Sequence, residues 1–115
     1  MSDYYIKAIM LEGCQYSINA KKLLEKHNIN AEIININYNE KENYKTSEIK
    51  TFPQIYLCKY NNKGTQLLGG YTDLEAFISD FKNKPLDINK VHNFEQKYLW
   101  SKKATLRLIQ LINLQ

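Results

Sequence analysis

One cysteine in this sequence stands where its surroundings favour chemistry. Cys14 lies in the segment Gly-Cys-Gln-Tyr-Ser of residues 13–17, between an apolar, strand-like run over 4–11 and a helix-like run over 17–27. A cysteine at the start of a helix has its sulfur among backbone N–H groups that lack helical partners, at the positive end of the helix dipole. This setting favours the thiolate, which is the nucleophilic form. Glu12 opposes the effect, because a nearby carboxylate disfavours a second negative charge.

The alternative for Cys14 is a structural role, since free cysteine often packs as a small hydrophobic residue. Its position favours a site instead, because open α/β sheets bind ligands at the carboxyl edge of their strands. Ser17 stands where a Cys-x-x-Cys pair has its second cysteine, and a hydroxyl cannot close a disulfide. Any disulfide of Cys14 is therefore expected to involve an outside thiol, although Ser17 is equally well explained as an ordinary residue of the first helical turn. Cys58 lies in a predicted strand and is expected to be buried and inert.

Pro53 marks a second stretch that could border a site. It precedes a predicted strand, where proline is tolerated because it has no N–H to donate to the ladder. By frequency alone the Phe52–Pro53 bond is expected to be trans. A cis bond would leave the backbone N–H and C=O of Phe52 free to pair with an extended peptide ligand.

Gly69 and Gly70 form a third stretch, just before a predicted helix. The start of that helix could hold a carboxylate on the N–H groups of Thr72 and Asp73. Taken in isolation, a tight turn that needs positive φ is the simpler explanation of the two glycines.

Periodicity along the chain predicts a small α/β domain that would position these stretches. The predicted elements are a strand over 4–11, a helix over 17–27, a strand over 31–37, a short helix and loop over 38–50, a hairpin of strands 55–60 and 65–68 with its turn at 61–64, and a helix capped by Thr72 and Glu75. The first two strands form a βαβ unit and should run parallel. We therefore expect a mixed four-stranded sheet flanked by helices.

The C-terminal residues 85–115 are predicted to form an extension to a domain of residues 1–84. Asp87 could cap a helix that runs to about Trp100, and residues 102–114 predict a second helix that is apolar over a wide arc. A helix that apolar does not stay exposed, so we expect it to pack on or near the domain. The alternative is docking on another protein, including a second copy of this chain.

Composition excludes several classes of function. The chain has 115 residues, of which 43% are hydrophobic and 24% charged, which indicates one globular domain. Its net charge of +4 comes from dispersed lysines, so no nucleic-acid partner is expected. No apolar run is long enough to span a membrane and residues 1–3 lack the features of a signal peptide, so a cytoplasmic location without a membrane partner is expected. Two cysteines without neighbouring ligands predict no metal site.

Three stretches, taken together and in this order, resemble the glutaredoxin family, which has the thioredoxin-like fold. Residues 14–17 (Cys-Gln-Tyr-Ser) stand where the family has Cys-Pro-Tyr-Cys or a Cys-x-x-Ser variant. Residues 51–56 (Thr-Phe-Pro-Gln-Ile-Tyr) are similar to a family segment whose proline is cis, and residues 69–73 (Gly-Gly-Tyr-Thr-Asp) match the glutathione-binding turn of small bacterial members. The resemblance covers about residues 4–83 and implies the order β-α-β-α-β-β-α.

The resemblance implies that glutathione is the ligand and that it forms a mixed disulfide with Cys14. The binding residues that it implies are Gln15, Tyr16, Phe52, Pro53, Gly70, Thr72 and Asp73. This sequence departs from the family at three positions. Leu11 replaces the usual Lys or Arg, for which Lys45 and Lys50 are candidate substitutes; Gln15 replaces proline; and Ser17 replaces the resolving cysteine.

Three functional hypotheses follow from the sequence. The leading one is a monothiol, glutathione-dependent thiol–disulfide oxidoreductase, whose partners are glutathione and glutathionylated proteins. The second is a [2Fe–2S] cluster held between two protomers by one cysteine and one glutathione from each. The third is a redox-inactive interaction module. A monomer is expected, with a dimer open through a shared cluster or the C-terminal helix.

Overall fold

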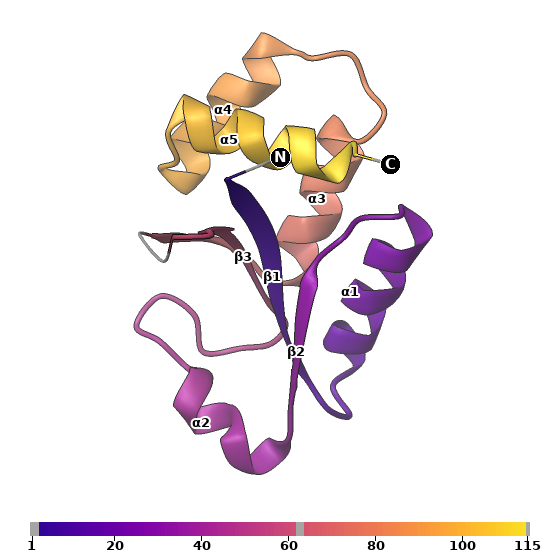
Figure 1. Cartoon of the computed structure of the whole chain (residues 1–115), viewed down its shortest axis with the longest axis vertical. Coiled ribbons are helices and arrows are strands. Elements are labelled where there is room, and N and C mark those ends of the chain that lie inside the picture. The colour runs from indigo at the N-terminus through magenta and orange to yellow at the C-terminus, as the bar shows by residue number, and fades with distance from the viewer. Residues whose placement is uncertain (1–2, 62–63, 115) are drawn as a thin grey trace.

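A computed structural model describes residues 3–61 and 64–114. Within these ranges one mixed sheet has the strand order β2-β1-β3-β4 (Figure 1). The strands are β1 (Tyr4–Leu11), β2 (Glu32–Ile36), β3 (Gln54–Lys59) and β4 (Thr65–Gly69). β1 pairs parallel with β2 and antiparallel with β3, and β3 pairs antiparallel with β4. The predicted mixed α/β sheet is confirmed, while residues 62 and 63 of the predicted hairpin turn lie outside the described residues.

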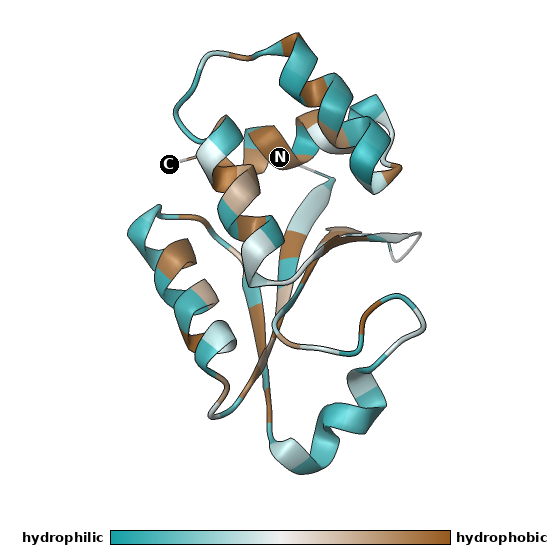
Figure 2. Cartoon of the chain, turned by 180° about the vertical axis from the view of Figure 1, so that it is seen from behind, coloured by the Kyte–Doolittle hydropathy of each residue, from teal (hydrophilic) through white to brown (hydrophobic). Residues whose placement is uncertain are grey.

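The helices follow the predicted order. They are α1 (Gln15–Lys26), a 3-10 turn η1 (Tyr38–Glu40) that leads into the short α2 (Lys41–Tyr44), α3 (Tyr71–Phe81), α4 (Ile88–Tyr98) and α5 (Lys102–Ile112). Figure 2 shows apolar bands alternating with polar ones along the longer helices, whereas α2 is mostly polar. This alternation is what a helix with one buried face requires. None of the helices in the described ranges is long and apolar enough to cross a membrane.

The hydrophobic core lies mainly on one face of the sheet. Because successive side chains of a strand point to opposite faces, alternate residues of β1 enter different clusters. Ile6 and Met10 face α1 and α3 in the larger cluster, where Leu24 and Phe77 cover them. The smaller cluster, on the other face, is built from Ile9, Ile36 and Phe52. Phe52 is thus anchored in the smaller cluster, which positions the loop before β3.

Helices α4 and α5 complete the larger cluster rather than forming a core of their own. The residues that they and their connection contribute are Val91, Phe94, Trp100, Ala104, Leu108 and Ile112. The buried Lys82 follows α3, and its ammonium group donates to the C=O of Ile112 at 2.7 Å. A cation at the carbonyl end of α5 also complements the helix dipole. The domain and its extension therefore share one hydrophobic core.

Two helix starts differ from the predicted ones. α1 begins at Gln15 rather than Ser17, so Cys14 is its N-cap. The predicted N-cap of α3, Thr72, is wrong: the N-cap is Gly70, and Asp73 rather than Glu75 reaches back to it. The reason is local, because a carboxylate three residues after the N-cap can accept the N-cap N–H whatever the N-cap residue is. The cap of α4 is as predicted, since the Asp87 carboxylate accepts the N–H groups of the first turn.

Candidate active site

Cys14 lies at the junction between β1 and α1. Its backbone is extended, with φ −87° and ψ 121°, and its C=O accepts the N–H of Ile18 at 3.0 Å, as expected of an N-cap. Gly13, with φ 77°, allows the chain to reverse just before it. The N–H of Cys14 donates to the C=O of Leu11 at 3.1 Å, which closes the turn. The half-buried sulfur therefore lies at the N-terminus of α1, as the sequence predicted.

The Cys14 thiol faces the loop that precedes β3. It donates to the C=O of Phe52, with a distance of 3.7 Å between Sγ and O. The Phe52–Pro53 peptide bond is cis, as the family resemblance implied and as frequency alone did not. Two residues separated by 38 positions in the sequence are thus brought into contact at one edge of the sheet.

Ser17 is buried and contributes to the turn beneath Cys14. Its Oγ accepts the N–H of Leu11 at 3.0 Å, so both backbone groups of Leu11 bind the start of α1. Only 2% of Ser17 is exposed. It is therefore a buried residue of the first turn of α1 that cannot act as a redox partner for Cys14. Cys58 is buried as predicted, and this burial raises the pKa of its thiol.

A cleft of about 450 Å³ lies between the start of α1, the loop before β3 and the start of α3. It brings together five of the residues that the resemblance implied for glutathione, at positions distant in the sequence: Tyr16, Phe52, Gly70, Thr72 and Asp73. The other residues that line it are Glu48, Ile49, Thr51, Leu67, Gly69 and Tyr71. Cys14 stands at the margin of this cleft through its contact with Phe52.

Two of the implied binding residues do not line the cleft. The amide of Gln15 donates to the side chain of Asn19 at 2.8 Å, one turn further along α1. Pro53 instead lies beside the cleft-lining Gly70, since its carbonyl oxygen is 3.5 Å from where a Cβ on Gly70 would stand. The proline loop and the Gly-Gly turn are therefore neighbours, and Gly70 leaves the space between them open.

The start of α3 presents free backbone donors to the cleft. The first bond of the helix ladder runs from the N–H of Leu74 to the C=O of Gly70 at 3.1 Å. The N–H groups of Thr72 and Asp73 precede this bond, and such groups have no partner within a helix. Oδ2 of Asp73 accepts the N–H of Gly70 at 3.0 Å and so holds the turn in place. The geometry suits a small anionic group.

No basic side chain lines the cleft in the described part of the chain, where Glu48 and Asp73 are the charged residues. Leu11 packs against the smaller hydrophobic cluster. Of the two lysines proposed to substitute for it, Lys45 pairs with the carboxylate of Glu42 at 2.6 Å, and Lys50 does not line the cleft. The backbone N–H groups at the helix starts are therefore the main electropositive features of the site.

Tyr71 and Glu48 line the cleft but were not predicted from the sequence. The rings of Tyr71 and Tyr16 form a tilted pair, with 6.3 Å between their centroids, and both residues line the cleft. Tyr71 stands inside the Gly-Gly-Tyr-Thr-Asp motif, which could have pointed to it. No signal identifies Glu48, because its loop has neither periodicity nor a motif.

Among residues 3–61 and 64–114, no group of three or more His, Cys, Asp or Glu side chains is arranged to hold a metal ion. Both cysteines are free. A metal site made of side chains from this chain alone is therefore not seen in the described residues. This observation leaves the cluster hypothesis untested, because that cluster would take its ligands from glutathione and a second protomer.

Comparison with known proteins agrees with the fold. Residues 4–59 match the family model described as Glutaredoxin. Among solved structures, glutaredoxin 1 from Francisella tularensis, complexed with cacodylate, is 25% identical with a TM-score of 0.52, and the match covers 67% of this chain and 93% of that one. No curated protein sequence matches the chain. The general chemistry of the glutaredoxin family is thiol–disulfide oxidoreduction. The matches show that residues 4–59 are a glutaredoxin domain within a thioredoxin-like fold.

Proposed function

We propose that this protein removes glutathione from glutathionylated proteins, using Cys14 as its one reactive thiol. The observation that carries the proposal is the position of the Cys14 sulfur. It lies at the start of α1 and 3.7 Å from the carbonyl of Phe52, beside a cleft with free helical N–H donors. A thiolate is the attacking species in thiol–disulfide exchange, and a helix N-terminus favours it.

The first step transfers glutathione to Cys14. The Cys14 thiolate attacks the glutathione sulfur of the mixed disulfide, and a new S–S bond forms as the old one breaks. The protein substrate leaves as a thiolate and takes a proton from water. In the second step, the thiolate of a second glutathione attacks the bound glutathione sulfur, which releases oxidised glutathione and restores the Cys14 thiolate.

Glutathione fits the polar groups of the cleft in an extended form. Its γ-glutamyl carboxylate would accept the N–H groups of Thr72 and Asp73, which suits the positive end of the α3 dipole. Its cysteine backbone would pair with that of Phe52, and the ring of Tyr16 would cover one side. With these contacts the glutathione sulfur, rather than the sulfur of the substrate protein, would lie next to Cys14.

The test is turnover of a glutathionylated peptide with reduced glutathione as co-substrate. We expect Cys14→Ser to lose turnover, because a hydroxyl does not attack a disulfide at neutral pH. Cys58→Ser is the matched control, and it should retain turnover because the buried Cys58 has no part in either step. Turnover retained by Cys14→Ser would overturn the proposal.

Cluster binding stays an alternative hypothesis. Protein purified anaerobically with iron, sulfide and glutathione would show visible absorbance and a dimeric mass if Cys14 and glutathione held a [2Fe–2S] cluster. Colourless, monomeric protein that turns over the peptide would support the oxidoreductase proposal instead.

A further inference from the structure

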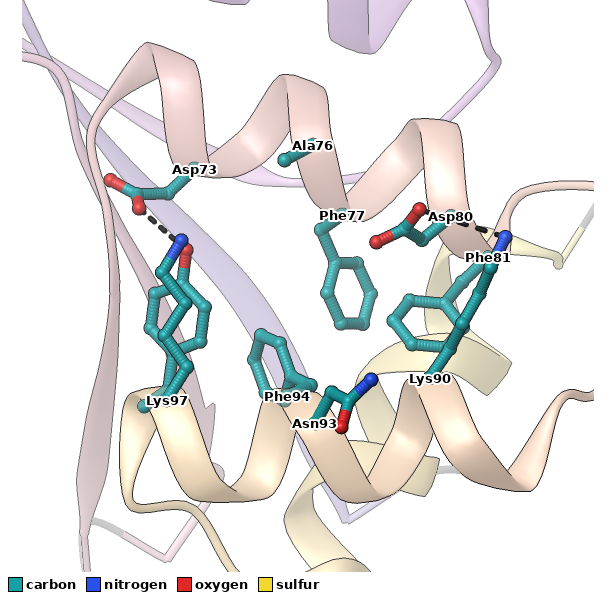
Figure 3. Close-up of a pocket in the computed structure, with 10 residues that line it drawn as sticks. Asp73, Ala76, Phe77, Asp80, Phe81, Lys90, Asn93, Phe94 and Lys97 are labelled. Carbon is teal, nitrogen blue, oxygen red and sulfur yellow. Dashed lines mark hydrogen bonds and ion pairs between the residues drawn. The ribbon is translucent and has the colours of Figure 1, made fainter.

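A hydrogen bond joins the C-terminal extension to Asp73 of the candidate site. The phenol of Tyr98, the last residue of α4, donates to Oδ1 of Asp73 with a distance of 2.6 Å between the oxygens. Figure 3 shows α3 and α4 side by side and antiparallel, so the end of α4 lies beside the start of α3. The other oxygen of Asp73 holds the N–H of Gly70. One carboxylate therefore joins the extension to the turn that lines the cleft.

A ring stack and a neighbouring hydrogen bond hold the end of α4 in place. The ring of Tyr98 stacks on Phe94, with 4.5 Å between the centroids and 27° between the planes. Two residues later, the indole N–H of Trp100 donates to the C=O of Leu67 at 3.2 Å. Leu67 lies on β4 and also lines the cleft. The end of α4 and the residues just after it are thus bonded to β4 and to α3, the two elements on either side of the Gly-Gly turn.

The hydrogen bond from Tyr98 is of a strong and persistent kind. An O–H donor on a carboxylate forms a charge-assisted bond, which is shorter and stronger than a neutral one. Burial and then the contact with Asp73 raise the pKa of Tyr98 well above its ordinary range, so the phenol keeps its proton and remains a donor. The Asp73 carboxylate also lies against Gly69, where a Cβ would collide with it. It therefore has little freedom to move.

We propose that Tyr98 is a positioning residue for glutathione. By holding the Asp73 carboxylate in the orientation that caps Gly70, it fixes the first turn of α3 and the N–H groups of Thr72 and Asp73 that receive the γ-glutamyl carboxylate. The inference rests on the proposed function. It makes residues 85–115, which lie beyond the matched residues 4–59, a part of the binding site.

The variant Tyr98→Phe tests this, because it keeps the ring stacked on Phe94 and removes only the O–H. We expect the KM for the glutathionylated peptide to rise about fivefold, which corresponds to the loss of one hydrogen bond that orders the turn. We expect kcat to change less than about twofold. kcat should hold because Tyr98 does not touch the reacting sulfur atoms. In a Cys14→Ser background, the Kd for S-methylglutathione should rise by the same factor, which measures binding without any reaction.

Two controls and a double mutant separate positioning from general loosening of the fold. Tyr60→Phe removes an exposed phenol at the far end of β3 and should leave KM unchanged. Lys82→Met removes the contact with Ile112, so it should lower the melting temperature of the protein without changing the Kd. In an Asp73→Ala background, which has no side-chain acceptor, Tyr98→Phe should have no further effect, because Tyr98 acts through that carboxylate.

The outcomes distinguish this inference from the proposed function. An unchanged Kd in Tyr98→Phe, a full effect that persists in Asp73→Ala, or an equal effect of Lys82→Met overturns the positioning role, while turnover through Cys14 still stands. Failure of the Cys14→Ser background to bind S-methylglutathione, together with turnover retained by Cys14→Ser, overturns both.

Discussion

Ser17 shows how a single residue decides which chemistry Cys14 can perform. Its hydroxyl accepts the N–H of Leu11 and is almost entirely buried, so it holds the turn that presents Cys14. A cysteine at this position would have its sulfur in the same first turn of α1. With serine at this position Cys14 has no second thiol in the first turn of α1, although the backbone is arranged as it would be for a pair.

We expect Ser17→Cys to convert the site to a dithiol one. On mild oxidation, Cys14 and the new cysteine should form an intramolecular disulfide, because positions i and i+3 at a helix start lie within disulfide reach. Thiol titration and the mass of the monomer under non-reducing conditions measure this. Ser79→Cys, on the exposed side of α3, is the control and should form no internal disulfide. An oxidised Ser17→Cys protein with all its thiols free would contradict the expectation.

At the scale of elements, the junction between β4 and α3 is organised by Asp73. Its carboxylate accepts N–H and O–H donors from Gly70 and Tyr98 and packs against Gly69, whose φ is 138°. The absence of a side chain at Gly69 is what admits the carboxylate. Gly69 is therefore needed for space as well as for backbone conformation.

Substitution of Gly69 and Gly64, two of the three positive-φ glycines among the described residues, separates these effects. Gly69→Ala and Gly64→Ala both impose strain of about 1–3 kcal/mol. Only Gly69→Ala also displaces Asp73 from its two partners, whereas a Cβ at Gly64 meets no atom within 4 Å. We expect Gly69→Ala to lower the free energy of unfolding by at least about 1 kcal/mol more than Gly64→Ala. Urea denaturation measures both, and equal losses would contradict the role of Asp73.

For the whole molecule, the decisive feature is that the extension shares the core of the domain. Phe94 contacts the rings of Phe77, Tyr98 and Trp100, with centroid distances of 5.1, 4.5 and 5.3 Å. Val91 and Ile112 are fully buried in the same cluster. Loss of the extension would expose this surface, so we expect the domain and extension to unfold as one cooperative unit.

The variant Phe94→Ala tests whether the domain and the extension unfold together. We expect it to lower the free energy of unfolding by about 3–5 kcal/mol, since it leaves a cavity between α3 and α4. Leu99→Ala, at a residue that is 89% exposed, removes apolar atoms without a cavity and should cost less than about 0.5 kcal/mol. Thermal denaturation followed by far-UV circular dichroism and by Trp100 fluorescence should show coincident transitions. Two separate transitions would show that the extension folds independently.

The sequence by itself determined the features that depend on local interactions. The strand over residues 4–11, the βαβ unit, the hairpin and the Asp87 cap follow from periodicity and from side chains within a few residues of each other. Cys14 at a helix start followed from the same reasoning. The error at the start of α3 was also local, because Thr72 with Glu75 and Gly70 with Asp73 are competing N-cap pairs and sequence alone does not rank them.

Only the tertiary structure decided the contacts between distant segments. The sulfur of Cys14 meets Phe52 across 38 positions, and Asp73 meets Tyr98 across 25. Neither pairing leaves a periodic or spacing signal, because each depends on how the sheet and the shared core bring separate elements together. The sequence could therefore propose glutathione-binding residues by resemblance, but the part that the extension plays beside them appears only when α4 packs on α3.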